Sequence, residues 1–226
     1  TKENRQRGGI AIPELDYDPV FLNRFCVEEL MADRVTFLHE AENFDWEGTW
    51  HIDGRSPLWN FNLHYFEYIH PLAHCYSETG ERKYLDTAKY NFDKTYARAV
   101  SDDLGGGLFW RVENQCKNTC VNCPGAVAAM YLLKATGDES YCEKAAYCFD
   151  WAYRIMFEPD TGKVYDAIDL NGKINKWSST YNQGTFIGSA LMLWEKTGDE
   201  KYMTSAKMAA KYVKDVMYRG GIMNNE

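Results

Sequence analysis

Two adjacent carboxylates stand at the start of a glycine-rich segment. Asp102 and Asp103 are the only consecutive Asp residues in the chain, and three glycines follow them at 105–107. Neighbouring carboxylates can supply a nucleophile and a general acid or base. Consecutive glycines permit positive φ angles and a close approach of the backbone to a ligand. The sequence therefore makes Asp102 and Asp103 candidate catalytic residues, with a solvated loop or turn as the alternative.

Three other residue patterns have weaker chemical interpretations. Cys116, Cys120 and Cys123 resemble a metal-cluster spacing, but positions i, i+4 and i+7 also form one face of a helix, where Cys packs as a small apolar residue. The glycine run has neither the Walker spacing nor the dinucleotide fingerprint. His64 is a candidate base, although its aromatic neighbours favour a packed core histidine. We therefore expect no metal and no cofactor.

A short repeat indicates which elements position these residues. The pattern Thr-Gly-charged residue, with a Tyr three residues later, occurs at 79–84, 136–141 and 197–202. The copies are 57 and 61 residues apart, and an Ala lies four residues after each Tyr. Gly in the left-handed region ends one helix, and an acidic residue favours the positive end of the next. Each copy therefore predicts a tight corner between two helices.

Between these corners the pattern predicts helices over about 18–38, 59–76 (with a kink or break at Pro71), 81–99, 118–135, 139–156, 182–196 and 199–218. Residues 1–17 are expected to be an extended arm, and 164–166 a small hairpin. The connections at 100–117 and 157–181 are long and contain Gly, Trp, Asn and Asp. Because they alternate with the tight corners, they should gather at one end of the helices and form a pocket.

Composition limits the partners. The chain has 226 residues, a net charge of −8, seven Trp and sixteen Tyr. The acidic balance argues against nucleic acid, and no apolar run reaches membrane-spanning length. Flat aromatic side chains suit neutral, multi-hydroxyl ligands, although core packing is the alternative. The odd number of Cys and the lack of a visible signal peptide slightly favour the cytoplasm.

The loop motifs resemble those of glycoside hydrolase family 76, the endo-α-1,6-mannanases and related fungal cell-wall proteins. The resemblance covers about residues 79–226 and rests on segments 105–110, 117–122, 164–166 and 177–184. It implies an (α/α)6 toroid, an oligo- or polysaccharide ligand, and a secreted or periplasmic location as an alternative to the cytoplasm. The positions matching residues that shape the cleft or its walls are Trp110, Lys117, Asn118, Asn122, Asp166, Tyr181, Asn182 and Gln183.

The resemblance breaks at the catalytic position. The family's two adjacent aspartates precede the first Thr-Gly corner, where this chain has Asn62, Leu63 and His64. Retaining glycoside hydrolysis needs two carboxylates, so these residues cannot replace the pair. Asp102 and Asp103 remain the candidates, although the family often carries a non-catalytic acidic residue at that place.

The earlier part of the chain resembles the N-terminal region of heparinase II/III-type polysaccharide lyases. The similarity lies in residues 37–38, 45–46 and especially 57–68. That family also builds an incomplete α/α toroid.

Both resemblances imply one all-α, toroid-like domain over residues 18–226. Six hairpins of about 60 residues would need roughly 350 residues, so we expect a homo-oligomer or a further chain segment to complete the ring. Three functions compete: a mannanase-like hydrolase, a non-catalytic glycan-binding or scaffold module, and a uronate polysaccharide lyase.

Overall fold

The computed structural model describes residues 24–44, 52–64, 68–111 and 113–225. The extended arm expected at 1–17 lies outside these residues, as do the side chain of His64 and all of Tyr65. The chain divides within helix α5 (Arg82–Ala99) into two compact units, Thr1–Thr95 and Tyr96–Glu226. None of the described helices is both long and apolar enough to cross a lipid bilayer.

The first unit contains a β-hairpin where the sequence predicted a helix. Helix α2 covers only Val27–Met31, and strand β1 (Arg34–Phe37) then pairs antiparallel with β2 (Glu40–Asn43). Leu38 and His39 form the turn at φ 54° and 65°. Val35 and Phe37 are buried on one face of β1, so their period is two residues and the predicted helix over 18–38 was wrong here.

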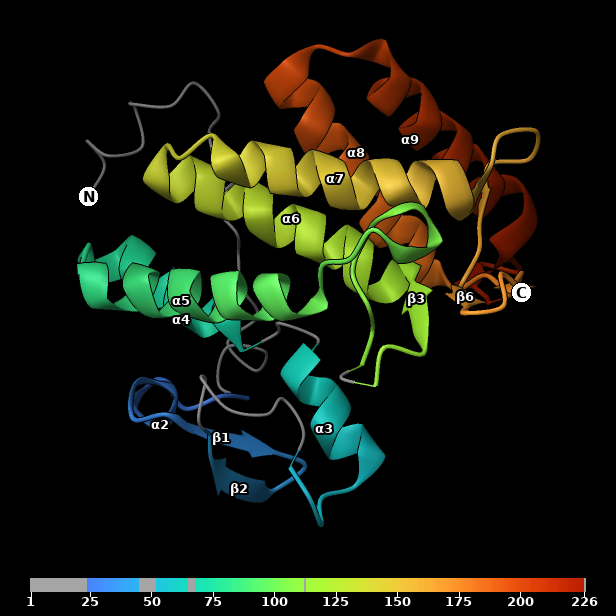
Figure 1. Cartoon of the computed structure of the whole chain (residues 1–226). Coiled ribbons are helices and arrows are strands. Elements are labelled where there is room, and N and C mark those ends of the chain that lie inside the picture. The colour runs from blue at the N-terminus through green and yellow to red at the C-terminus, as the bar shows by residue number, and fades with distance from the viewer. Residues whose placement is uncertain (1–23, 45–51, 65–67, 112, 226) are drawn as a thin grey trace. The chain divides into compact units, whose positions relative to one another are not determined.

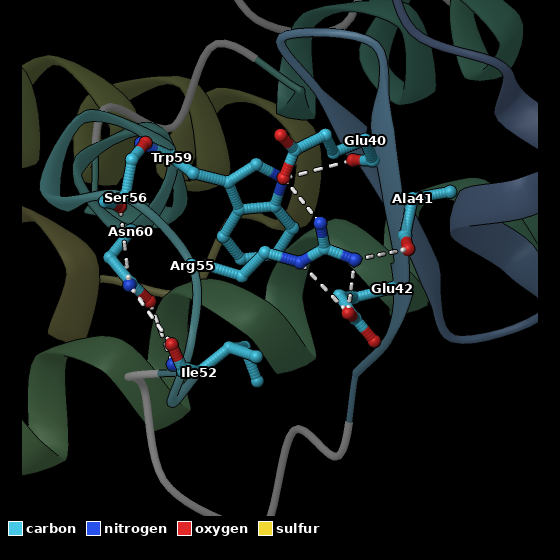
Figure 2. Close-up of polar contacts among 8 residues, drawn as sticks. All are labelled: Glu40, Ala41, Glu42, Ile52, Arg55, Ser56, Trp59 and Asn60. Carbon is cyan, nitrogen blue, oxygen red and sulfur yellow. Dashed lines mark hydrogen bonds and ion pairs between the residues drawn. The ribbon is translucent and has the colours of Figure 1, made fainter.

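Aromatic packing and one arginine hold this hairpin. The ring of Phe37 lies 5.1 Å from Trp59 and 6.1 Å from Tyr68. Arg55 donates to the side chains of Glu40 and Glu42, and Trp59 Nε1 donates to the Glu40 carbonyl at 2.9 Å, as Figure 2 shows. The guanidinium thereby joins β2 to the segment that enters the next helix.

The predicted helix over 59–76 is divided in two. Helix α3 spans Pro57–His64 and α4 spans Ile69–Thr79. Pro71 lies in the first turn of α4, where its missing N–H would have no helical partner, so the division precedes the proline.

In the second unit, two antiparallel helical hairpins pack together. Helix α6 (Thr119–Thr136) pairs with α7 (Ser140–Ile155), α8 (Thr180–Thr197) pairs with α9 (Glu200–Tyr212), and α6 packs on α8 (Figure 1). The ring of Phe149 lies 4.8 Å from Phe186 and 5.3 Å from Tyr202, which places aromatic side chains at the centre of the core. A short π-helix, Val213–Met217, follows α9 directly.

The three predicted corners are confirmed. Gly80, Gly137 and Gly198 end α4, α6 and α8 at φ 71–73°. Each threonine hydroxyl closes its corner: Thr136 Oγ1 donates to the Leu132 carbonyl at 2.7 Å and accepts from Asp138 N at 3.2 Å. Equivalent bonds occur at Thr79 and Thr197. These bonds explain why threonine precedes each glycine.

Small strands connect the long loops. Strand β3 (Cys116–Asn118) pairs antiparallel with β6 (Ala167–Asp169), which pairs with β7 (Ile174–Asn175). Strands β4 (Phe157–Glu158) and β5 (Lys163–Val164) form a separate hairpin, so the region around 164–166 joins two hairpins instead of forming one. A last hairpin joins β8 (Tyr218–Arg219) to β9 (Ile222–Met223).

Candidate functional site

The two long loops meet, as the sequence predicted. The β3–β6 pairing joins segment 116–118 to segment 167–169 directly before α6 begins, and Figure 1 shows β3 and β6 on the same side of the helical hairpins. Thr180 N, at the start of α8, donates to Asn225 Oδ1 at 2.9 Å, which brings the chain after α9 to the same end. The N-terminal ends of α6 and α8 therefore lie beside the gathered loops.

A buried lysine holds the loop that carries the two candidate catalytic residues. Lys117 is fully buried, and its Nζ donates to the carbonyls of Ser101, Asp103 and Gly106 at 2.7 Å each. Burial lowers the pKa of Lys117 to about 8, while Asp103 and Asp102 oppose the shift. Three carbonyl oxygens require the three N–H donors of an ammonium, so the charge holds the loop closed.

Helix α7 holds the same loop through residues one turn apart. Tyr147 Oη donates to the Ser101 carbonyl, Trp151 Nε1 to the Leu104 carbonyl and Arg154 Nη2 to the Gly105 carbonyl. Sequence reasoning missed all three, although their i, i+4, i+7 spacing marks one helix face.

The glycine run has the positive φ angles expected of it. Gly105, Gly106 and Gly107 have φ of 81°, 110° and 80°. A Cβ on Gly107 would lie 2.7 Å from Trp151 and 2.8 Å from Asn122. The backbone at Gly107 therefore packs closely against these two side chains. A close approach of this backbone to a ligand stays a prediction.

Asp102 and Asp103 are exposed, and both carboxylates take part in loop contacts. Tyr147 Oη donates to Asp102 Oδ1 at 3.0 Å. Ser101 Oγ donates to Asp103 Oδ2 at 2.7 Å and accepts from Asp103 N at 3.1 Å. The pair is thus held in place from its own loop and from α7, and its catalytic role stays a prediction.

Two buried amides also bind backbone. Asn122 pairs with Leu108, accepting from its N–H at 2.7 Å and donating to its carbonyl at 3.1 Å. Gln183 accepts from Val164 N at 2.5 Å and donates to the carbonyls of Gly162 and Ala209, both at 3.1 Å. Like Lys117, these side chains shape the loops with their polar atoms, and direct contact with a ligand stays a prediction for all three.

Other predicted residues converge on one carboxylate. Asp166, which is half-buried, accepts from Asn182 Nδ2 at 3.1 Å on one oxygen and from Asn175 Nδ2 at 3.0 Å on the other. Asn118 lies beside it through its register with Ala167. The Oδ1 atoms of Asn118 and Asn182 are buried without a hydrogen-bond partner. Buried polar atoms normally have hydrogen-bond partners, so these two are exceptions beside the carboxylate, and contact of either amide with a ligand stays a prediction.

Aromatic side chains lie close by along the chain. Tyr181 and Trp177 are 46% and 44% exposed, high values for side chains of this size. Trp177 precedes α8, and Tyr181 lies in its first turn. Trp177 was not among the predicted site residues; its exposure, which the sequence cannot give, is what identifies it. Trp110 is half-buried, with the guanidinium of Arg111 4.2 Å from its ring centroid.

The cysteines have no metal-ligand arrangement: no group of three or more His, Cys, Asp or Glu suited to a metal occurs among the described residues. All seven cysteines are free thiols. Cys120 and Cys123 lie on α6, and burial raises the pKa of each to about 12. Their surroundings therefore favour the neutral thiol over the thiolate that metals bind.

Comparison with known proteins decides the family. The sequence model of glycosyl hydrolase family 76 matches residues 72–226, which are more than half of the chain. The chain belongs to glycosyl hydrolase family 76. The mannan endo-1,6-alpha-mannosidase DFG5 of Saccharomyces cerevisiae is 28% identical over 155 residues, which are 64% of this chain and 34% of that protein. The mannan endo-1,6-alpha-mannosidase DCW1 of Candida glabrata is 31% identical over 128 residues, which are 52% of this chain and 28% of that protein.

A solved family 76 structure has the same fold. The alpha-1,6-mannanase GH76A of Salegentibacter sp. HEL1_6 is 32% identical, with a TM-score of 0.66 over 74% of this chain and 50% of that one. It is an inactive variant, with two consecutive aspartates changed to asparagine, in complex with alpha-1,6-mannotriose. The predicted fold class, all-α hairpins of the (α/α) toroid type, is confirmed. This chain spans about a third of the curated relatives' length and half of that of the solved mannanase.

Proposed function

We propose that this chain forms the loop-bearing part of a glycoside hydrolase that binds and cleaves α-1,6-linked mannan. The observation that carries the proposal is Asp166, whose two oxygens accept from Asn182 and Asn175 where the two long loops meet. A carboxylate can accept hydrogen bonds from sugar hydroxyls, and the N–H groups of the amides beside it can donate to them. Family membership and the mannotriose complex of the related mannanase support the same ligand class.

Binding tests this assignment. Calorimetry with α-1,6-mannotriose should detect binding to the chain. Asp166→Ala should weaken this binding about tenfold or more, because the sugar hydroxyls would lose the carboxylate that accepts their hydrogen bonds. Asp160→Ala is the matched control, since Asp160 is exposed in the β4–β5 turn. Equal affinity for the two variants would remove Asp166 from the site.

For the catalytic step we propose Asp102 and Asp103 as the carboxylate pair. They are the only consecutive aspartates of the chain, and hydrogen bonds from Tyr147 and Ser101 hold both carboxylates in place. Release of reducing ends from α-1,6-mannan should be abolished by Asp102→Asn and by Asp103→Asn, because a retaining mechanism needs both groups.

A non-catalytic glycan-binding module is the second candidate. The observation that favours it is that both carboxylates already accept hydrogen bonds within the protein, from Tyr147 and Ser101. Mannotriose binding without release of reducing ends would establish this function and exclude the pair as catalysts.

The lyase resemblance of residues 57–68 gives a third proposal with its own test. A lyase would produce an unsaturated product from uronate polymers, which ultraviolet absorbance detects. The family match begins at residue 72, after this segment. No rise in absorbance would end the proposal.

A further inference from the structure

A pocket of about 430 Å³ opens on the three-stranded sheet of the second unit. It lies where β3, β6 and β7 meet, and Figure 1 places β3 and β6 beside the gathered loops. Its lining combines apolar side chains with cationic and polar ones: Cys116, Ala167, Asp169, Lys173, Ile174, Asn175 and Lys176.

The charge of this pocket is unusual for the chain. The protein has a net charge of −8, yet Lys173 and Lys176 line the pocket and form no ion pair with any carboxylate of the described residues. Lys176 Nζ lies 5.1 Å from the centroid of the Tyr165 ring, and its charge helps to lower the pKa of Glu158. The one carboxylate present, Asp169, accepts from the backbone N–H groups of Asn171 and Lys173 at 2.9 Å each. These bonds hold the β6–β7 turn, and the lining as a whole has two lysines against one carboxylate.

The pocket shares a wall with the Asp166 site. Asn175 lines the pocket while its Nδ2 donates to Asp166 Oδ2 and its Oδ1 accepts from Trp177 N at 3.2 Å. A ligand held at Asp166 would therefore lie next to this pocket.

We propose that this pocket is an accessory subsite for an anionic substituent, a phosphate or a carboxylate, on the mannan-type glycan bound at Asp166. The inference rests on the proposed function and narrows its substrate to glycans that carry negative charge. Lysine suits this role because its ammonium is a compact charge with three donors that adapts to either anion.

The test compares three trisaccharides by calorimetry: α-1,6-mannotriose, the same compound with a phosphate ester on its terminal 6-hydroxyl, and the analogue with a carboxylate at that carbon. One or both anionic compounds should bind about two- to thirtyfold more tightly than the neutral one, the range for two exposed charge pairs. The preference should decline with added salt. The preferred anion identifies the substituent.

Paired variants locate the effect. Lys173→Gln together with Lys176→Gln should abolish the preference and leave neutral mannotriose affinity unchanged, whereas Lys207→Gln, on an exposed position of α9, should preserve it. Inorganic phosphate alone should compete with the anionic trisaccharide. Equal affinity for all three compounds, or a preference that survives the double change, overturns the inference and leaves the proposed function intact. Failure of even neutral mannotriose to bind would instead contradict the proposed function.

Discussion

Replacing Lys117 with methionine tests how the loop of Asp102 and Asp103 is held. Methionine keeps the length and apolar character of the side chain but removes the ammonium. Three charge-assisted hydrogen bonds, each 2.7 Å long, are lost. At about 2 kcal/mol each they contribute about 6 kcal/mol.

An opposing effect reduces this loss. Burial lowers the pKa of Lys117 from 10.5 to about 8, so the desolvated charge costs about 3 kcal/mol at neutral pH, and methionine removes that cost. The expected net destabilisation is about 3 kcal/mol. For a chain of this size it corresponds to a fall in Tm of about 6–12 °C.

Thermal and urea unfolding followed by circular dichroism measure this change, with Lys207→Met as the exposed control. Amide exchange should accelerate at Ser101 and Gly106, whose N–H groups bond within the loop. The pH dependence has a definite sign. Because the folded state releases the lysine proton near pH 8 and the unfolded state near 10.5, the stability gap between wild type and variant should widen over that interval. A variant as stable as Lys207→Met, or one with unchanged loop exchange, would refute the reasoning.

Three further predictions concern the fold. Gly162→Ala should lower the free energy of unfolding in urea by more than about 3 kcal/mol, since its Cβ would lie 2.2 Å from the Met208 carbonyl oxygen at φ +84°. The control Gly172→Ala, at φ +78° with open space around the Cβ, should lower it by only about 1–2 kcal/mol. Equal losses would exclude the clash. Thr136→Val should lower stability by about 1 kcal/mol in the same assay through its two corner hydrogen bonds, and no loss would show that the glycine alone sets the corner. Under reducing conditions, the stability of wild type relative to Cys123→Ala should fall as pH rises above 9, because the pKa of Cys123 is raised to about 12 and the unfolded thiol ionises first. A difference between the two proteins that stays constant up to pH 10 would contradict this prediction.

Local signals in the sequence determined the helical corners. Each depends on neighbours within a few residues: a glycine that accepts positive φ, a threonine that bonds one turn back, and an acidic residue at the next helix start. Such interactions form wherever the local sequence occurs, so helices α5 to α9 and their order could be predicted. The alternation of short and long connections likewise predicted that the loops would meet.

Contacts between distant residues decided what the sequence did not. The expected helix before residue 38 gave way to a hairpin because Phe37 packs on Trp59 and Arg55 binds Glu40 and Glu42. Residue type also did not reveal that Lys117 supports the loop, which follows from its burial and its bonds to three carbonyls. The pairing of 116–118 with 167–169 joins segments about fifty residues apart, and no local propensity encodes such a partner. Short-range backbone chemistry thus determined the helices and corners, whereas burial and long-range pairing decided which polar side chains support the loops.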